Sequence, residues 1–182
     1  MKRFIAIGIM AVLVMMAFTN SRRLPELAPI VVMPHQNHIK GGTKAFMNAI
    51  AGMESDHNQY AVNEFGNLGK YQFSPRTLRK MGVNTTKEEF LSNETLQDSV
   101  MMEYMQQNYR ELYPLVKDKI GTYVNGILIT KAGILAGAHL VGSQGVCAYF
   151  YPERCHAILE DANGATIEMY MRKFGNYNIS FE

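Results

Sequence analysis

The chain has 182 residues, of which 47% are hydrophobic and 19% charged; this composition suits one folded domain and argues against disorder throughout. Lysine and arginine number 18 against 16 acidic residues, and Lys2 and Arg3 account for the difference. The rest of the chain is balanced in charge and lacks the basic surplus with which proteins neutralise nucleic-acid phosphates. We therefore expect no nucleic-acid partner.

The N-terminus has the pattern of an export signal. Two basic residues precede an apolar run at residues 4–18, which is followed by small polar residues. The run is shorter than the roughly 20 residues of a membrane-spanning helix, so we interpret residues 1–21 as a cleaved signal peptide. An uncleaved membrane anchor is the alternative. Residues 22–42 are interrupted by prolines and glycines and are interpreted as a linker, which leaves 43–182 as the domain.

The first predicted helix covers residues 43–55. Apolar side chains recur along it at helical spacing: Phe46, Met47, Ile50 and Met53. Thr43 is the expected N-cap. Glu54 projects from the margin of the apolar stripe near the C-terminal end, where partial burial and the helix dipole both favour a neutral carboxyl group. Such a group can protonate a leaving-group oxygen, although a glutamate that only solvates the helix end is the alternative.

The segment after this helix predicts a β-hairpin. Residues 60–64 and 70–73 have some strand character, and the five residues between them include two glycines and an asparagine, which tolerate positive φ. A short helix should follow, with Ser74 as N-cap and Pro75 at its first position, and should end at Gly82.

Three segments carry a resemblance to a known family. Residues 49–55 (AIAGMES), 61–63 (AVN) and 69–78 (GKYQFSPRTL) together resemble the signature of lysozyme-like lytic transglycosylases. The pair Glu54 and Ser55 matches the family's first motif. Residues 137–142 (GAHLVG) stand where the family usually has Ala-Tyr-Asn.

The resemblance covers most of residues 46–177. It implies a mainly α fold of the α+β kind, lysozyme-like, with a small β-hairpin beside the active-site cleft. It also implies peptidoglycan glycan strands as the substrate, Glu54 as the catalytic acid and base, and no cofactor. The sequence itself predicts no metal site, since His35 and His38 lack a third ligand at suitable spacing.

Two further helices are predicted before residue 115. Thr86 and Glu89 have the spacing of a capping box. Asn93 caps a longer helix at residues 94–113, whose methionine-rich side is assigned to the core, and Pro114 lies beyond it. Three of its polar residues are expected to face solvent: Gln97, Glu103 and Gln107.

The apolar helix predicted at residues 132–141 contains one strongly polar side chain, His139. The dipeptide at residues 125 and 126, Asn-Gly, predicts a hairpin or a tight loop before it, and Thr130 is its cap. A buried polar group needs a partner. The resemblance places His139 near the acid, where it would bond Glu54 or substrate; a core histidine bonded to a backbone carbonyl is equally admissible. Leu140 stands where the family has an asparagine. The resemblance therefore does not extend to the substrate contact that this asparagine makes.

The two cysteines and the C-terminal segment complete the predicted domain. Cys147 and Cys155 are the only cysteines, and in an exported protein they predict a disulfide. Residues 161–164 indicate a turn, and Thr166 caps a last helix that should end at Gly175.

The reaction depends on what faces Glu54. A retaining hydrolase needs a second carboxylate about 5 to 5.5 Å away and an inverting one a base about 6.5 to 9.5 Å away; Asp56 and Glu64 are the nearby candidates. A lytic transglycosylase needs one carboxylate, because the 6-hydroxyl of N-acetylmuramic acid attacks its own anomeric carbon. We expect this non-hydrolytic cleavage of the bond to N-acetylglucosamine, which leaves a 1,6-anhydro end. The expected substrate-binding residues are Ser55, Tyr71, Gln72, His139 and Glu64.

Three other functions remain as alternatives: a lysozyme-type muramidase, a non-catalytic peptidoglycan-binding module, and an unrelated exported helical interaction domain. We expect a monomeric protein that is periplasmic or secreted and that acts on peptidoglycan strands. Cell-envelope machinery is a further partner that the sequence allows.

Overall fold

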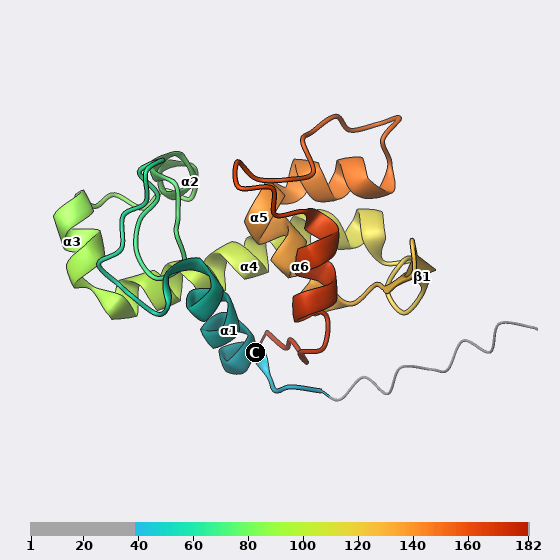
Figure 1. Ribbon diagram of the computed structural model, residues 1–182, viewed down its shortest axis with the longest axis horizontal. Helices are drawn as coiled ribbons and strands as arrows, with labels where there is room; N and C mark the ends of the chain where they lie inside the picture. The colour runs from blue at the N-terminus through green and yellow to red at the C-terminus, as the bar shows by residue number, and fades with distance from the viewer. Residues whose placement is uncertain (1–38, 182) are drawn as a thin grey trace, which may run out of the picture. The chain divides into compact units, whose positions relative to one another are not determined.

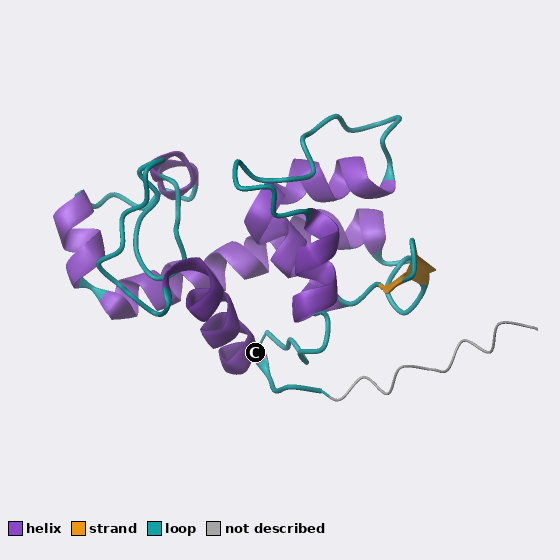
Figure 2. Ribbon diagram, in the orientation of Figure 1, coloured by secondary structure: helices purple, strands orange, loops and turns teal. Residues whose placement is uncertain are grey.

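The computed structural model describes residues 39–181, and the fold in this part is mainly helical, as predicted (Figures 1 and 2). The predicted signal peptide and most of the linker lie outside the described residues. The elements are α1 (Thr43–Ser55), α2 (Pro75–Lys80), α3 (Lys87–Ser92), α4 (Glu94–Val116), β1 (Tyr123–Val124), β2 (Ile127–Leu128), α5 (Lys131–Phe150) and α6 (Ile167–Phe174). Within residues 39–181, none of the helices has the length and apolar character that crossing a membrane requires.

Helix α1 has the predicted bounds but a different cap. Its N-cap is Gly42, with no side-chain hydrogen bond, whereas the Thr43 hydroxyl is bonded to both the carbonyl and the N–H of Ser180. The expectation that Thr43 caps the helix was therefore wrong, because a tertiary contact takes its hydroxyl. Asp56, in the left-handed conformation at φ 52°, ends the helix directly after the motif that contains Glu54.

The predicted hairpin at residues 60–73 is absent from the described structure. Only isolated bridges form there, between Val62 and Leu68 and between Leu68 and Phe73. Positive φ values at Gly69 (75°) and Gln72 (54°) turn the backbone too often for two strands to run side by side. The segment is a compact loop in which Leu68 pairs with both Val62 and Phe73.

The short helices begin as predicted. The Ser74 hydroxyl accepts a hydrogen bond at the start of α2, and Thr86 and Glu89 form both bonds of the capping box. Helix α4 runs past its predicted end and contains Pro114 in its last turn. A proline there removes only one backbone hydrogen bond, and Pro114 itself lies on the exposed side of the helix, which lowers the cost.

The C-terminal half contains the one sheet of the described chain. Asn125 (φ 50°) and Gly126 (φ 69°) form the tight turn of the predicted hairpin between β1 and β2. Thr130 caps α5, which continues to Phe150 across a break at Gly142 (φ 72°, ψ 173°). The predicted disulfide between Cys147 and Cys155 is present.

Two hydrophobic clusters hold the domain together. The larger joins α1, the loop at residues 68–73 and the first part of α4 to residues of α5 and α6. The smaller joins the end of α4 to the hairpin and to other residues of α5 and α6. Figure 1 shows α2 and α3 on the left and α5, α6 and the hairpin on the right, with α4 running through both groups. Residues of both groups, together with α1 and α4, line the candidate site.

Candidate active site

A cleft of about 620 Å³ contains Glu54. Its walls come from the end of α1, the loop at residues 63–74, the middle of α4, the break in α5, the loop at residues 161–165 and α6. Segments far apart in the sequence therefore converge on one carboxyl group. Such a concave site with a few converging polar groups is the usual form of a ligand-binding site.

Glu54 is held by neighbours from two other helices. Its side chain is 18% exposed, and the Tyr170 hydroxyl donates a 2.7 Å hydrogen bond to Oε1. His139 Nε2 lies 3.7 Å from the same oxygen, which is a contact and not a hydrogen bond. Among residues 39–181, no hydrogen bond reaches the other oxygen, Oε2. The carboxyl group is thus oriented through one oxygen while the other stays free for a ligand.

Tyr170 acts as a permanent hydrogen-bond donor. Tyr170 is only 4% exposed to solvent. Burial raises the pKa of its hydroxyl, and the negative charge of Glu54 and the hydrogen bond to it raise this pKa further. The hydroxyl therefore keeps its proton at neutral pH.

His139 is a neutral group beside the acid. Its side chain is 7% exposed and meets the rings of Phe73 and Tyr104 edge-on, at centroid distances of 5.8 and 6.1 Å. Burial lowers the pKa of the imidazole, and the opposing effects of the Glu54 charge and of the Tyr71 backbone are smaller. Its Nδ1 is buried and has no hydrogen-bond partner among the described residues. The described surroundings thus favour an uncharged ring.

The structure brings two of the predicted substrate-binding residues to the cleft, His139 and Gln72. Gln72 lines the cleft, and its amide nitrogen donates to the carbonyl of Gly69 at 2.8 Å, which leaves its Oε1 as an acceptor. Ser55 does not line the cleft, but its hydroxyl donates to the Lys70 carbonyl at 3.0 Å. Ser55 therefore ties the end of α1 to the loop that carries Gln72.

Tyr71 and both predicted second carboxylates lie elsewhere. Tyr71 is 2% exposed and its hydroxyl donates to Asp98 at 2.5 Å, outside the cleft. Glu64 is exposed in a turn, and Asp56 is exposed at the end of α1; neither lines the cleft. Neither Tyr71 nor Glu64 therefore lines the cleft around Glu54, and their roles as substrate contacts stay predictions.

A carboxylate that was not predicted as a site residue, Asp161, does line the cleft. Its Oδ1 accepts hydrogen bonds from the backbone N–H groups of Asn163 (2.9 Å) and Ala165 (2.8 Å). The sequence indicated the turn but not its location, which depends on how the loop packs. Tyr170 was likewise counted only as an apolar residue of the last helix, and nothing local marked it as a partner of Glu54.

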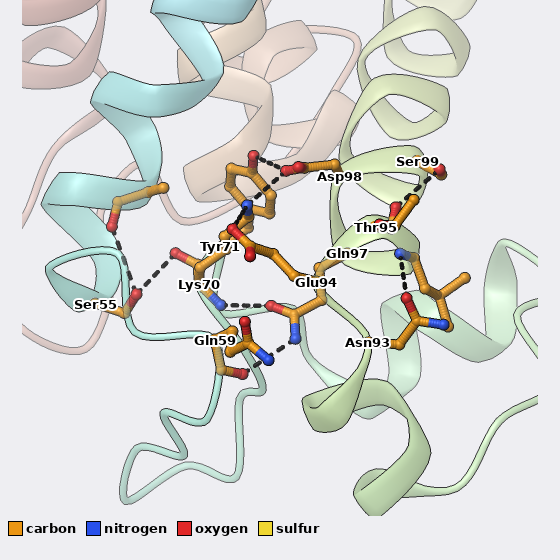
Figure 3. A network of polar contacts seen from close by, with 12 residues as sticks. Ser55, Gln59, Lys70, Tyr71, Asn93, Glu94, Thr95, Gln97, Asp98 and Ser99 are labelled. Atoms are coloured by element: carbon orange, nitrogen blue, oxygen red, sulfur yellow. Dashed lines mark hydrogen bonds and ion pairs between the residues drawn. The ribbon is translucent and has the colours of Figure 1, made fainter.

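A larger cavity of about 1050 Å³ lies against a different face of α1 and contains an internally paired network (Figure 3). Lys70 Nζ is 2.7 Å from Glu94 and 2.9 Å from Asp98. Burial alone would lower the pKa of Lys70, but the hydrogen bonds and charges of these two carboxylates together raise it. Both carboxylates are engaged by the single ammonium group of Lys70, so we assign this cluster to structure and not to catalysis.

Gln97 is the centre of the same network (Figure 3). It is fully buried, so the prediction that it faces solvent was wrong. Its Oε1 accepts from the Lys70 N–H at 2.8 Å, and its Nε2 donates to the carbonyls of Gln59 (3.1 Å) and Phe90 (2.9 Å). This one amide joins the loop behind the cleft to α3 and α4.

The part of the chain that the structure describes has no cluster of three or more histidine, cysteine, aspartate or glutamate side chains suited to a metal ion. Comparison of the chain with protein-family models, with curated proteins and with solved structures gave no match. A function must therefore be argued from the chemistry of the cleft and from the sequence motifs.

Proposed function

We propose that this chain is a peptidoglycan lytic transglycosylase with Glu54 as its general acid and base. The observation that supports this most is the setting of Glu54: it lies partly buried in a cleft, with Oε1 bonded to Tyr170 and Oε2 free. The motifs at residues 49–55 and 69–78 add the resemblance to lysozyme-like enzymes, and a lysozyme-like fold is part of the proposal.

In the first step, Glu54 acts as an acid. With the proton on Oε2, it protonates the glycosidic oxygen that links N-acetylmuramic acid to N-acetylglucosamine, and the bond from that oxygen to the anomeric carbon breaks. Positive charge develops on the sugar as Glu54 becomes a carboxylate. The neutral donor Tyr170 stabilises that carboxylate through Oε1, so this interaction strengthens as the reaction proceeds.

In the second step, Glu54 acts as a base. Its carboxylate takes the proton from the 6-hydroxyl of the same muramic acid residue, and the 6-oxygen bonds to the anomeric carbon. The attack is intramolecular, which gives it a large advantage over attack by water. The product is a 1,6-anhydro end, Glu54 has its proton again, and no water is consumed.

A hydrolase remains the second candidate because of one observation, the presence of Asp161 in the cleft. As the second carboxylate of a muramidase it would have to act as nucleophile or base. Its Oδ1 is already occupied by two backbone N–H groups, a setting typical of a turn-forming aspartate. We therefore favour the mechanism that needs Glu54 alone.

An oxidising compartment is part of the proposal. The disulfide between Cys147 and Cys155 is of a kind that persists in the periplasm or outside the cell. This supports export, together with the signal pattern of residues 1–21.

The mass of the glycan ends tests the reaction type. Purified sacculi are incubated with the protein, and the released fragments are analysed by mass spectrometry. We expect muramic acid ends that are lighter by one water than reducing ends. Reducing ends alone would identify a hydrolase and contradict the transglycosylase.

A further inference from the structure

We propose that the cleft selects glycan strands whose muramic acid carboxyl groups are amide-linked, as in strands that bear stem peptides, over stripped strands with free lactyl carboxylates. This inference rests on the proposed function and concerns the same cleft. Its basis is the charge of the lining: the residues described around the cleft include two carboxylic acids, Glu54 and Asp161, and neither lysine nor arginine.

Four cations lie on segments that border the cleft, and none of them lines it: Lys70, Arg76, Arg172 and Lys173. Lys70, next to the loop of Gln72, has its ammonium group between Glu94 and Asp98, beside the other cavity (Figure 3). Arg172 donates to backbone carbonyls of the hairpin turn. Lys173 is exposed and its ammonium contacts the sulfur of Met53 at the rim. His139, inside the cleft, is kept neutral by burial.

A free lactyl carboxylate would therefore enter this cleft without a cationic partner. Removing an ionised group from water is costly unless a cation or several donors replace the water. Ionised Asp161 would repel it, and so would Glu54 whenever it is ionised. A lactyl group that is amide-linked to a peptide has no charge and avoids both costs.

The cleft also has side chains that suit a neutral amide. Four carboxamides line it: Asn63, Asn67, Gln72 and Asn163. Asn63 Oδ1 accepts from the N–H groups of Phe65 and Asn67, which leaves its amide nitrogen as a donor. Gln72 donates to the loop and keeps its oxygen as an acceptor. One donor and one acceptor are what a substrate amide needs.

Three substrates from one batch of sacculi test the inference. The first keeps its stem peptides, the second is stripped by an amidase that leaves free lactyl carboxylates, and the third is stripped and then capped with methylamine through carbodiimide coupling. Initial rates of anhydro-end release are measured at low and at high salt, with wild-type protein and with Asp161→Asn.

We expect the peptide-bearing and methylamide strands to be cleaved about three- to tenfold faster than the carboxylate strands at low salt. The ratio should shrink at about 0.5 M salt and in Asp161→Asn, because screening or removal of the charge weakens the repulsion.

Equal or faster cleavage of the carboxylate strands would overturn the inference while leaving the proposed function intact. So would methylamide strands that are cleaved as slowly as the carboxylate strands, because charge would then not be the cause. Release of no anhydro ends from any of the three substrates would overturn the proposed function and the inference with it.

Discussion

Tyr170 and Glu54, separated by 116 positions in the sequence, are joined by a 2.7 Å hydrogen bond between the tyrosine hydroxyl and Oε1 of the carboxyl group. The bond links α6 to the end of α1 across the cleft. It fixes which oxygen of Glu54 is turned to the protein and which is left for substrate.

Tyr170→Phe should slow glycan cleavage without unfolding the protein. A hydrogen bond to a charged group contributes about 1.5 to 3 kcal/mol, so loss of the donor to the Glu54 carboxylate should lower the initial rate roughly 10- to 100-fold. Tyr123→Phe, on the exposed hairpin, is the matched control and should keep the wild-type rate. A wild-type rate in Tyr170→Phe would mean that this bond does not assist the reaction.

Asp161→Asn separates the two reaction types. An asparagine can still accept the two backbone hydrogen bonds of the turn, so the loop should keep its shape. We expect cleavage of peptide-bearing sacculi to fall by less than about threefold, since no step of the proposed mechanism uses this carboxylate. A loss of several hundredfold, measured as release of fragments, would instead identify Asp161 as the second carboxylate of a hydrolase.

His139 should make the protein less stable in mild acid. Burial holds the pKa of the folded-state imidazole below its ordinary value of about 6.5. Below that pH the unfolded chain binds a proton that the folded protein does not, so the free energy of unfolding falls as pH decreases, by at most about 1.4 kcal/mol per pH unit. The loss should level off once the pH is below the lowered pKa.

Urea unfolding at pH 7.5 and pH 5.5 measures this effect. His139→Phe retains an aromatic ring against Phe73 and Tyr104 but cannot titrate, so it should lose less stability on acidification than the wild type does. His156→Gln, an exposed position, serves as the control. If His139→Phe and the wild type lose the same amount, the imidazole is not the titrating group.

Gln97→Leu should destabilise the fold by about 2 to 3 kcal/mol. The substitution leaves the buried Lys70 N–H and the carbonyls of Gln59 and Phe90 without their partner, and unsatisfied buried groups are costly. Gln107→Leu, at an exposed position of the same helix, should change the free energy of unfolding by less than about 0.5 kcal/mol. Equal effects of the two substitutions on chemical denaturation would contradict the role assigned to Gln97.

The elements that sequence predicted well are those whose signals are local. The capping box of Thr86 and Glu89, the Asn125–Gly126 turn and the cap at Thr130 each depend on a few neighbouring residues. The disulfide followed from the chain having only two cysteines. The predicted hairpin at residues 60–73 is absent because Gln72, outside the predicted turn, also adopts positive φ, and because the segment that follows the turn bonds to α4.

The site was predicted in part for the same reason. Glu54 stands out by motif and by its place on an amphipathic helix, whereas Tyr170 and Asp161 reach it only through the packing of α6 and its preceding loop. Gln97 did carry a signal that could have shown its burial. It begins a row at helical spacing that continues through Met101, Met105 and Leu112, all of them buried.

The most direct test of the central claim is anhydro-end formation from sacculi by Glu54→Gln. Glutamine preserves the shape of the side chain and can still accept the Tyr170 hydrogen bond, but it cannot donate and recover a proton as a carboxyl group does. Glu88→Gln, an exposed residue of α3, is the matched control. We predict that Glu54→Gln forms anhydro ends at least about a thousandfold more slowly than the wild type while unfolding at a similar temperature. Undiminished formation by Glu54→Gln would contradict a mechanism in which this carboxyl group is acid and base.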